Sequence, residues 1–181
     1  LSLPAYLKAK GYKTLSMGKV FHHQDDSDTS WSQPPYRGPK LCSKDYVLQA
    51  NIEESAHNPR QRASAFERVD TTDEAYLDGK LAHYALTQLE GMADSDTPVF
   101  MAVGFWKPHL PFVAPKSYWD MYNPKALPFP QNYFTPEAAP EASLHAYGEL
   151  RSYTDIPNDK ELPLDSALAR QLIHGYYACV S

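Results

Sequence analysis

The chain has 181 residues, of which 43% are hydrophobic and 22% are charged, and its formal net charge is -5. The length and composition are typical of a globular protein with a real core, which argues against a disordered or fibrous chain. The negative net charge gives no electrostatic support for binding nucleic acid. The sequence contains no apolar run of about 18 residues, so it predicts no membrane span.

The start of the chain predicts a helix followed by a strand. Ser2 can cap a helix that extends to Lys10, and Gly11 is a natural residue for ending it. Residues 12–17 then have the composition of a short strand.

A second helix and strand are predicted further along. Thr71 and Glu74 have capping-box spacing, which places a helix start at Thr71, and Gly91 marks the end. The predicted apolar stripe consists of Leu77, Leu81, Tyr84, Ala85 and Leu89. Residues 98–104 are continuously apolar and predict a buried strand. Helices that alternate with strands in this way indicate an α/β fold with a parallel sheet.

The remaining segments give weaker signals. Residues 21–69 have little regular pattern and predict a long irregular segment. The prolines between residues 108 and 163 exclude long helices there, but the aromatic residues among them indicate an ordered excursion. Residues 115–122 predict a short helix, and residues 165–181 predict a longer one with Asp165 as its N-cap.

Two short motifs place a cation beside an imidazole directly after a predicted strand. Residues 18–22 contain Lys19 and His22, and residues 107–112 contain Lys107 and His109. The ends of strands are where α/β enzymes place their chemistry. The two motifs together predict a pocket for an anion, with histidines that can transfer protons.

Each motif also has a simpler interpretation. Lys19 and His22 fit a surface lysine and a loop histidine as well as an anion contact with a nearby proton-transfer group. His109 lies between two prolines that restrict its backbone, which suits a general acid or base but equally suits a histidine packed in a turn.

Other polar residues suggest no further site. Asp25, Asp26 and Asp28 lack the glycine and glutamate of a calcium loop, which favours a solvated acidic loop. Cys42 and Cys179 lack metal-ligand spacing, and they fit either free thiols or one disulfide. No metal ligands are predicted within the chain. The isolated histidines fit surface or hydrogen-bonded positions: His57, His83, His145 and His174.

The order and spacing of these motifs resemble the type I sulfatases of the alkaline phosphatase superfamily. The resemblance rests on residues 11–14 followed by 18–22, on residues 73–76 and 98–112, and on the final helix at 174–181. The form of the two cation-imidazole motifs is most similar to the iduronate 2-sulfatase branch of that family.

The resemblance implies an α/β sandwich with a central, mostly parallel sheet and hydrolysis of sulfate esters by a formylglycine residue with a calcium ion. It implies that Lys19 contacts the nucleophile and the sulfate, and that His22 hydrogen-bonds the formylglycine hydroxyl. His109 would protonate the leaving oxygen, and Lys107 would lie near the substrate. The implied substrates are sulfated sugars such as glycosaminoglycans, in a periplasmic, secreted or lysosomal location. The sequence gives no indication of oligomeric state.

The chain departs from the family pattern at both ends. It lacks the C/S-x-P-x-R nucleophile motif, the early aspartate pair and the late Asp-His-Gly segment. We therefore expect residues 1–181 to be the central part of a sulfatase catalytic domain with an incomplete sheet. The calcium ligands and formylglycine are expected elsewhere, and the fragment alone is expected to be inactive. The alternatives are a phosphodiesterase or phosphonate hydrolase of the same superfamily, and a non-catalytic relative that binds sulfated glycans.

Overall fold

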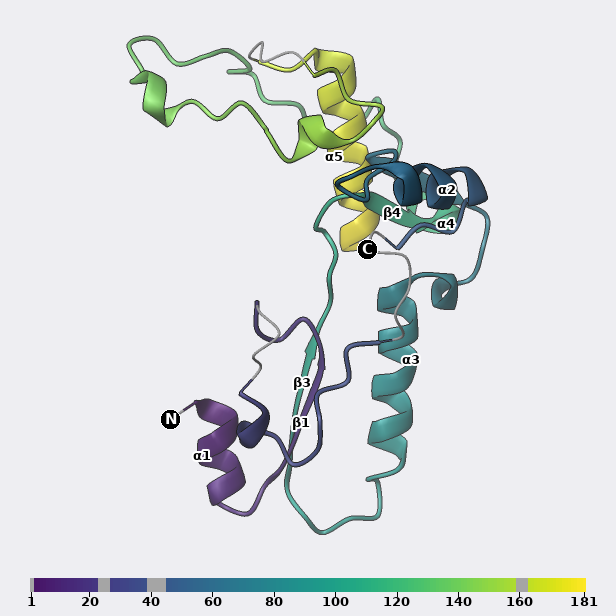
Figure 1. The fold of residues 1–181 in the computed structure, drawn as a ribbon, viewed down its shortest axis with the longest axis vertical. Helices are drawn as coiled ribbons and strands as arrows, with labels where there is room; N and C mark the ends of the chain where they lie inside the picture. The colour runs from purple at the N-terminus through teal and green to yellow at the C-terminus, as the bar shows by residue number, and fades with distance from the viewer. Residues whose placement is uncertain (1, 23–26, 39–44, 159–162) are drawn as a thin grey trace. The chain divides into compact units, whose positions relative to one another are not determined.

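The computed structural model describes residues 2–22, 27–38, 45–158 and 163–181 (Figure 1). The chain divides into two compact units, one made of residues 1–40 and 73–106 and the other of residues 41–72 and 107–181. The predicted α/β class is confirmed, because helices accompany strands that pair in parallel. Across the described ranges, each unit contains one two-stranded parallel sheet.

The first unit has a strand-helix-strand core. Its helices and strands are α1 (Leu3–Ala9), β1 (Lys13–Gly18), α3 (Leu77–Glu90) and β3 (Val99–Gly104). β1 and β3 pair in parallel, from Lys13 opposite Val99 to Gly18 opposite Gly104. Figure 1 shows α3 as the crossover that returns the chain to the start of β3.

The capping residue Ser2 and the glycine Gly11 correctly predicted where α1 begins and ends. The Ser2 hydroxyl accepts a hydrogen bond from the Ala5 N–H at 3.3 Å, as an N-cap should. Gly11 has a φ of +89°, the left-handed conformation that glycine adopts readily after a helix. The predicted helix and the strand that follows it are both confirmed, with β1 shifted by one residue.

The predicted start of α3 at Thr71 is wrong. Residues Asp73–Ala75 form a separate 3-10 turn, and α3 begins after Tyr76, an extended and buried residue. A Cβ added to Gly79 would lie only 2.0 Å from the carbonyl oxygen of Asp73, which is too close for any side chain. The 3-10 turn therefore packs against the first turn of α3. The start of this helix depends on the absence of a side chain at Gly79 and not on a capping box.

The core of the first unit lies between β1 and α3. Leu15 and Met17 of β1 pack with Leu81 and Ala85 of α3, and all four are buried. Leu89 is 51% exposed, so the predicted apolar stripe is buried only in part. β3 is half-buried where a fully buried strand was expected.

Two glycines allow the ends of β1 and β3 to approach closely. A Cβ on Gly18 would lie 2.2 Å from the Gly104 carbonyl oxygen, and a Cβ on Gly104 would lie 2.1 Å from the Lys19 carbonyl oxygen. The Lys19 N–H donates to the Gly104 carbonyl at 2.7 Å. The backbone of Lys19 is thus fixed beside the end of β3.

The second unit combines three helices with the other parallel pair of strands. Its elements are α2 (Gln49–His57), β2 (Phe66–Val69), β4 (Phe112–Pro115), α4 (Lys116–Asp120) and α5 (Ser166–Val180). β2 and β4 pair in register from Phe66 opposite Phe112 to Val69 opposite Pro115. The prediction that residues 21–69 are irregular is therefore wrong, since α2 and β2 lie within them.

A buried glutamate explains why α2 was not predicted. Glu67 of β2 is 2% exposed, and its carboxylate accepts from the N–H groups of Val47 and Leu48 at 2.8 and 3.1 Å. It also accepts from the Asn51 side-chain amide at 2.8 Å. These groups lie at the N-terminus of α2, where a negative charge stabilises a helix. The cap thus comes from a distant residue.

The C-terminal part of the second unit agrees with prediction. Asp165 caps α5 by accepting from the N–H groups of Ala167 and Leu168 at 2.9 and 3.1 Å. The ring of His174 is hydrogen-bonded to the Trp119 carbonyl at 2.9 Å, as expected for a structural histidine. The described part of the excursion between α4 and α5 places Leu150, Tyr153 and Ile156 in a buried cluster.

Some predicted features lie outside the described residues, namely the acidic loop at Asp25 and Asp26 and the choice between thiol and disulfide at Cys42. Within the part of the chain that is described, no helix has both the length and the apolar character needed to cross a membrane.

We predict that Gly104→Ala destabilises the protein, because the added Cβ collides with the Lys19 backbone and not with a side chain that can rotate away. The expected loss is about 1–3 kcal/mol in the free energy of unfolding, measured by denaturant titration. Gly148→Ala is the matched control, since nothing lies within 4 Å of its added Cβ. Equal midpoints for the two variants would contradict the close approach.

We predict that Glu67→Ala lowers the free energy of unfolding by about 1–3 kcal/mol, because it removes the buried carboxylate that accepts part-buried hydrogen bonds from the backbone N–H groups at the start of α2. Glu53→Ala is the control, because Glu53 is an exposed residue of α2 whose carboxylate accepts a surface hydrogen bond from the Gln49 side chain. Its expected change is within about 0.5 kcal/mol. A similar loss in both variants would argue against the capping role.

Candidate active site

Lys19 and His22 lie just beyond the carboxyl end of β1, as the sequence predicted. Lys19 is half-buried, whereas His22 is exposed three residues later. The Lys19 ammonium lies over the ring of Trp106, 5.4 Å from its centroid. A cation therefore stands at the strand end, held there by the glycine contact behind it and an aromatic ring beside it.

Lys107 belongs to the turn that contains His109. Its ammonium donates to the Pro111 carbonyl at 2.7 Å and lies 3.4 Å from the His109 carbonyl. The bonds before Pro108 and Pro111 are both cis. In this structure Lys107 closes its own turn, and the role near a substrate that the resemblance implied stays a prediction.

The His109 ring is exposed and oriented by a single backbone contact. Its Nδ1 lies 2.6 Å from the Leu110 carbonyl oxygen, and because a carbonyl only accepts, Nδ1 carries the hydrogen. Nε2 is then the ring nitrogen that can exchange a proton with a bound molecule. An exposed ring nitrogen of this kind is compatible with proton transfer to or from a bound molecule.

The carboxylate of Glu149 and the guanidinium of Arg62 lie on the Nε2 side of the His109 ring. Nε2 lies 3.9 Å from Glu149 Oε1, which in turn lies 3.0 Å from Arg62 Nη2. Arg62 also contacts the Ser152 hydroxyl and stacks on the ring of Tyr153, with 5.1 Å from Cζ to the centroid. Glu149 is exposed, and ion pairs with an exposed partner add little stability, so the main effect of these contacts is to orient the groups involved.

Sequence reasoning missed Trp106, Glu149 and Arg62. Trp106 is adjacent to Lys107 in the chain, so an aromatic residue beside the motif was the only local signal for it. Glu149 and Arg62 lie 87 positions apart, and no short motif connects them. Their association with His109 depends on tertiary structure.

Two buried tyrosines lie near this part of the second unit. Burial raises the pKa of Tyr153 above its ordinary value of 10.0, and the nearby Arg62 guanidinium opposes that shift. Burial likewise raises the pKa of Tyr46, whose hydroxyl donates to the Ser64 carbonyl at 2.6 Å. Both side chains are therefore neutral over the pH range of ordinary assays.

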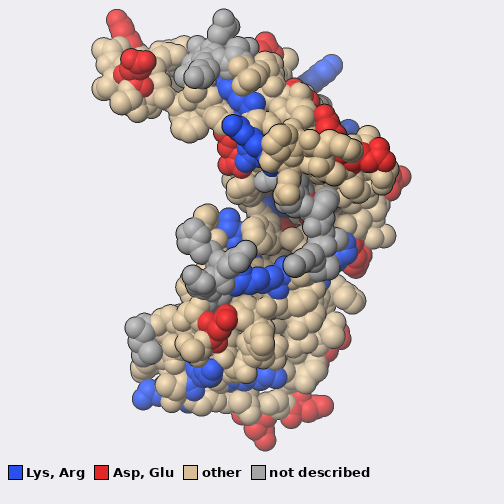
Figure 2. Space-filling model, viewed as in Figure 1, with Lys and Arg blue, Asp and Glu red and all other residues tan. Residues whose placement is uncertain are grey.

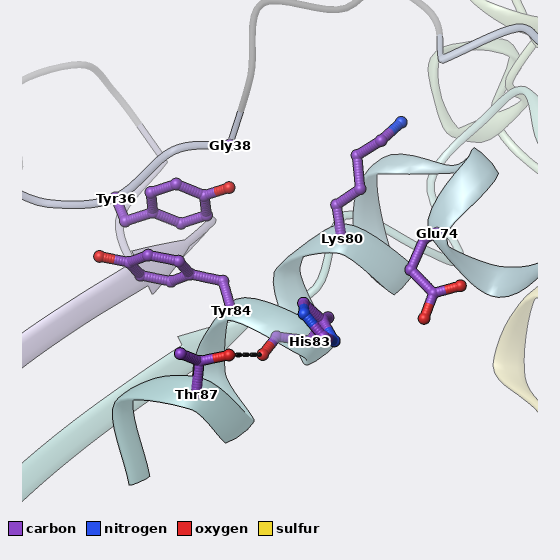
Figure 3. Close-up of a pocket in the computed structure, with 7 residues that line it drawn as sticks. All are labelled: Tyr36, Gly38, Glu74, Lys80, His83, Tyr84 and Thr87. Atoms are coloured by element: carbon purple, nitrogen blue, oxygen red, sulfur yellow. Dashed lines mark hydrogen bonds between the residues drawn. The ribbon is translucent and has the colours of Figure 1, made fainter. Parts of the chain in front are cut away.

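The first unit contains a pocket that is not lined by its predicted catalytic residues, Lys19 and His22. It has a volume of about 480 Å³ and is lined by Tyr36, Gly38, Glu74, Lys80, His83, Tyr84 and Thr87 (Figure 3). Tyr36 and Tyr84 stack with their centroids 3.6 Å apart. None of Lys19, His22, Lys107 and His109 lines it, so we assign it no part in the chemistry.

The described residues do not fit a calcium site. Across residues 2–22, 27–38, 45–158 and 163–181, no three histidine, cysteine, aspartate or glutamate side chains form a group that could hold a metal ion. Basic and acidic side chains both occur on the face shown in Figure 2, so an anion contact would depend on local cations such as Lys19.

Comparison with known proteins finds sulfatases that are similar to this chain. No family model matches the chain. Over 198 residues the chain is 29% identical to iduronate 2-sulfatase of Homo sapiens, and the mouse (Mus musculus) enzyme gives the same values; the alignment covers 99% of this chain and 34% of each relative. A sulfatase of Formosa agariphila is 24% identical over 191 residues, with 99% of this chain and 35% of the relative covered.

The chain is therefore related to the sulfatases, as its motifs predicted. Within that class it is similar to iduronate 2-sulfatase along nearly its whole length. It spans about a third of the length of the curated relatives that it matches.

We predict that the protein loses stability as the pH rises above about 10, where tyrosines of the unfolded chain begin to ionise. The pKa values of Tyr46 and Tyr153 are raised in the folded state, so their stabilising effect is complete below pH 10 and is lost towards the higher folded-state values. Denaturant midpoints at about pH 8 and 11 should therefore differ less for Tyr153→Phe than for the unaltered protein.

Tyr12→Phe is the control for this pH dependence, because Tyr12 is exposed. It should leave the difference between the two midpoints unchanged. If Tyr153→Phe behaves like Tyr12→Phe, the buried phenol does not contribute to alkaline unfolding.

Proposed function

We propose that this chain is part of a sulfatase that removes sulfate from sulfated sugars of the glycosaminoglycan kind. The similarity to sulfatases along 99% of the chain supports the reaction class. The preference for sugars has support only from the names of two relatives, the iduronate 2-sulfatases.

One structural observation carries the proposal: an exposed histidine whose ring is oriented by a hydrogen bond to a backbone carbonyl. His109 Nδ1 is bound to a backbone carbonyl, which leaves Nε2 to meet the bridging oxygen of a sulfate ester. Attack of the nucleophile on sulfur forms a new bond as the S–O ester bond breaks, which leaves negative charge on that oxygen. When the ring carries hydrogen on both nitrogens, a proton transferred from Nε2 converts the leaving group into a neutral alcohol, and the imidazolium becomes a neutral imidazole.

Lys19 has the complementary role in this proposal. An ammonium at the end of β1 can contact the sulfate oxygens and stabilise the charge that develops as the ester is cleaved. His22, three residues further on, is proposed to orient the nucleophile. A formylglycine residue and a calcium ion, both proposed to come from parts of the protein beyond this chain, would supply that nucleophile and further charge neutralisation.

We predict that His109→Ala, introduced into the complete protein that contains this chain, lowers kcat by about 10²–10⁴-fold on alkyl and sugar sulfates. Activated aryl sulfates should lose much less, because their leaving group departs without a proton. Initial rates of sulfate release from both substrate types check this.

His57→Ala is the matched control for that experiment. His57 is also exposed, and its Nδ1 also lies at hydrogen-bond distance, 2.7 Å, from a backbone carbonyl. It should retain full activity. Equal losses on alkyl and aryl sulfates after His109→Ala would argue against an acid role. Activity of the unaltered protein on phosphodiesters, with none on sulfate esters, would move the assignment to a phosphoester hydrolase.

A further inference from the structure

Trp106 occupies a place in the first unit that neither the sequence motifs nor the resemblance assigned. It follows β3 by two residues, and its ring lies against the Lys19 ammonium at 5.4 Å. The parallel register that ends with Gly18 opposite Gly104 brings the two residues together. The contact is therefore built by the ends of the two strands.

The backbone of Trp106 is fixed independently of its ring. Its N–H donates to both carboxylate oxygens of Asp78, at 2.9 and 3.1 Å. Asp78 lies in the first turn of α3, where a negative charge is stabilised by the helix dipole. Asp78 of α3 thus holds the backbone of Trp106, and the ring of Trp106 contacts the Lys19 ammonium beyond the end of β1.

An aromatic ring is an unusual partner for a lysine that must bind an anion. A lysine has a long, flexible stem, and holding its ammonium in one place costs conformational entropy. A carboxylate would hold it but would also neutralise its charge. The face of an indole attracts a cation through its quadrupole and has no net charge, so the ammonium stays available to an anion.

We propose that Trp106 is a positioning residue that holds the Lys19 ammonium where it meets the sulfate group, and that Asp78 keeps Trp106 in place. This inference rests on the proposed function, because it concerns the same sulfate contact. A purely structural role is less consistent with the burial: Trp106 is 40% exposed and is not part of the buried cluster formed by Leu15, Met17, Leu81 and Ala85.

The test uses the complete protein, a small aryl sulfate without a sugar ring, and inorganic sulfate as a competitive inhibitor. Trp106→Leu should weaken sulfate inhibition and lower kcat/KM by about three- to tenfold, with an unchanged melting temperature. Trp106→Phe should retain most of both, because it keeps an aromatic face. Phe105→Leu is the matched control: Phe105 is the adjacent residue and is 53% exposed, and its replacement should change neither quantity.

A double-mutant cycle separates positioning from structure. Lys19→Met removes the ammonium but keeps most of the stem, so Trp106→Leu should cause no additional loss of sulfate inhibition in that background. Independent, multiplicative losses would overturn the proposal. So would wild-type sulfate inhibition in Trp106→Leu.

The same experiments distinguish this inference from the proposed function. If the unaltered protein hydrolyses sulfate esters and Trp106→Leu matches it, only the inference is wrong. If the unaltered protein has no activity on sulfate esters, the proposed function fails and the inference fails with it. If Trp106→Leu affects sulfated sugars but not the aryl sulfate, the ring contacts the sugar and does not position Lys19.

Discussion

The close approach of two glycines, Gly18 and Gly104, is the constraint on which the first unit depends. The space for a Cβ on Gly18 is taken by the Gly104 carbonyl, and the space for a Cβ on Gly104 is taken by the Lys19 carbonyl. Because the strand ends meet this closely, Lys19 lies beside the residues that follow β3, including Trp106. The position of Lys19, the candidate anion-binding residue, thus depends on the lack of a side chain at Gly18 and at Gly104.

Elements with local signals could be predicted from the sequence, whereas elements stabilised from a distance could not. The helices α1 and α5 begin at their own capping residues, Ser2 and Asp165, and both were found. Helix α2 follows Leu48, which offers no side-chain cap, and its N-terminal donors bind Glu67 instead. The start of α3 was misplaced for a related reason, since backbone packing against Gly79 decides it.

The candidate site shows the same division. A lysine or histidine directly after a strand is visible in a short stretch of sequence, and Lys19 lies where it was predicted. The residues that orient these groups are not visible in that way. Glu149 approaches His109 only because the excursion between α4 and α5 returns to the turn, and Trp106 approaches Lys19 only through strand register. The catalytic roles themselves stay predictions.

The division of the chain into units has a consequence for how the protein is made. The units interleave along the sequence, with boundaries after residues 40, 72 and 106, so neither is one continuous stretch. During synthesis, both early strands must wait for their partners: β1 until residue 104 has left the ribosome, and β2 until residue 115 has. Each is until then a strand with unpaired backbone groups, and β1 waits over the longer stretch of chain.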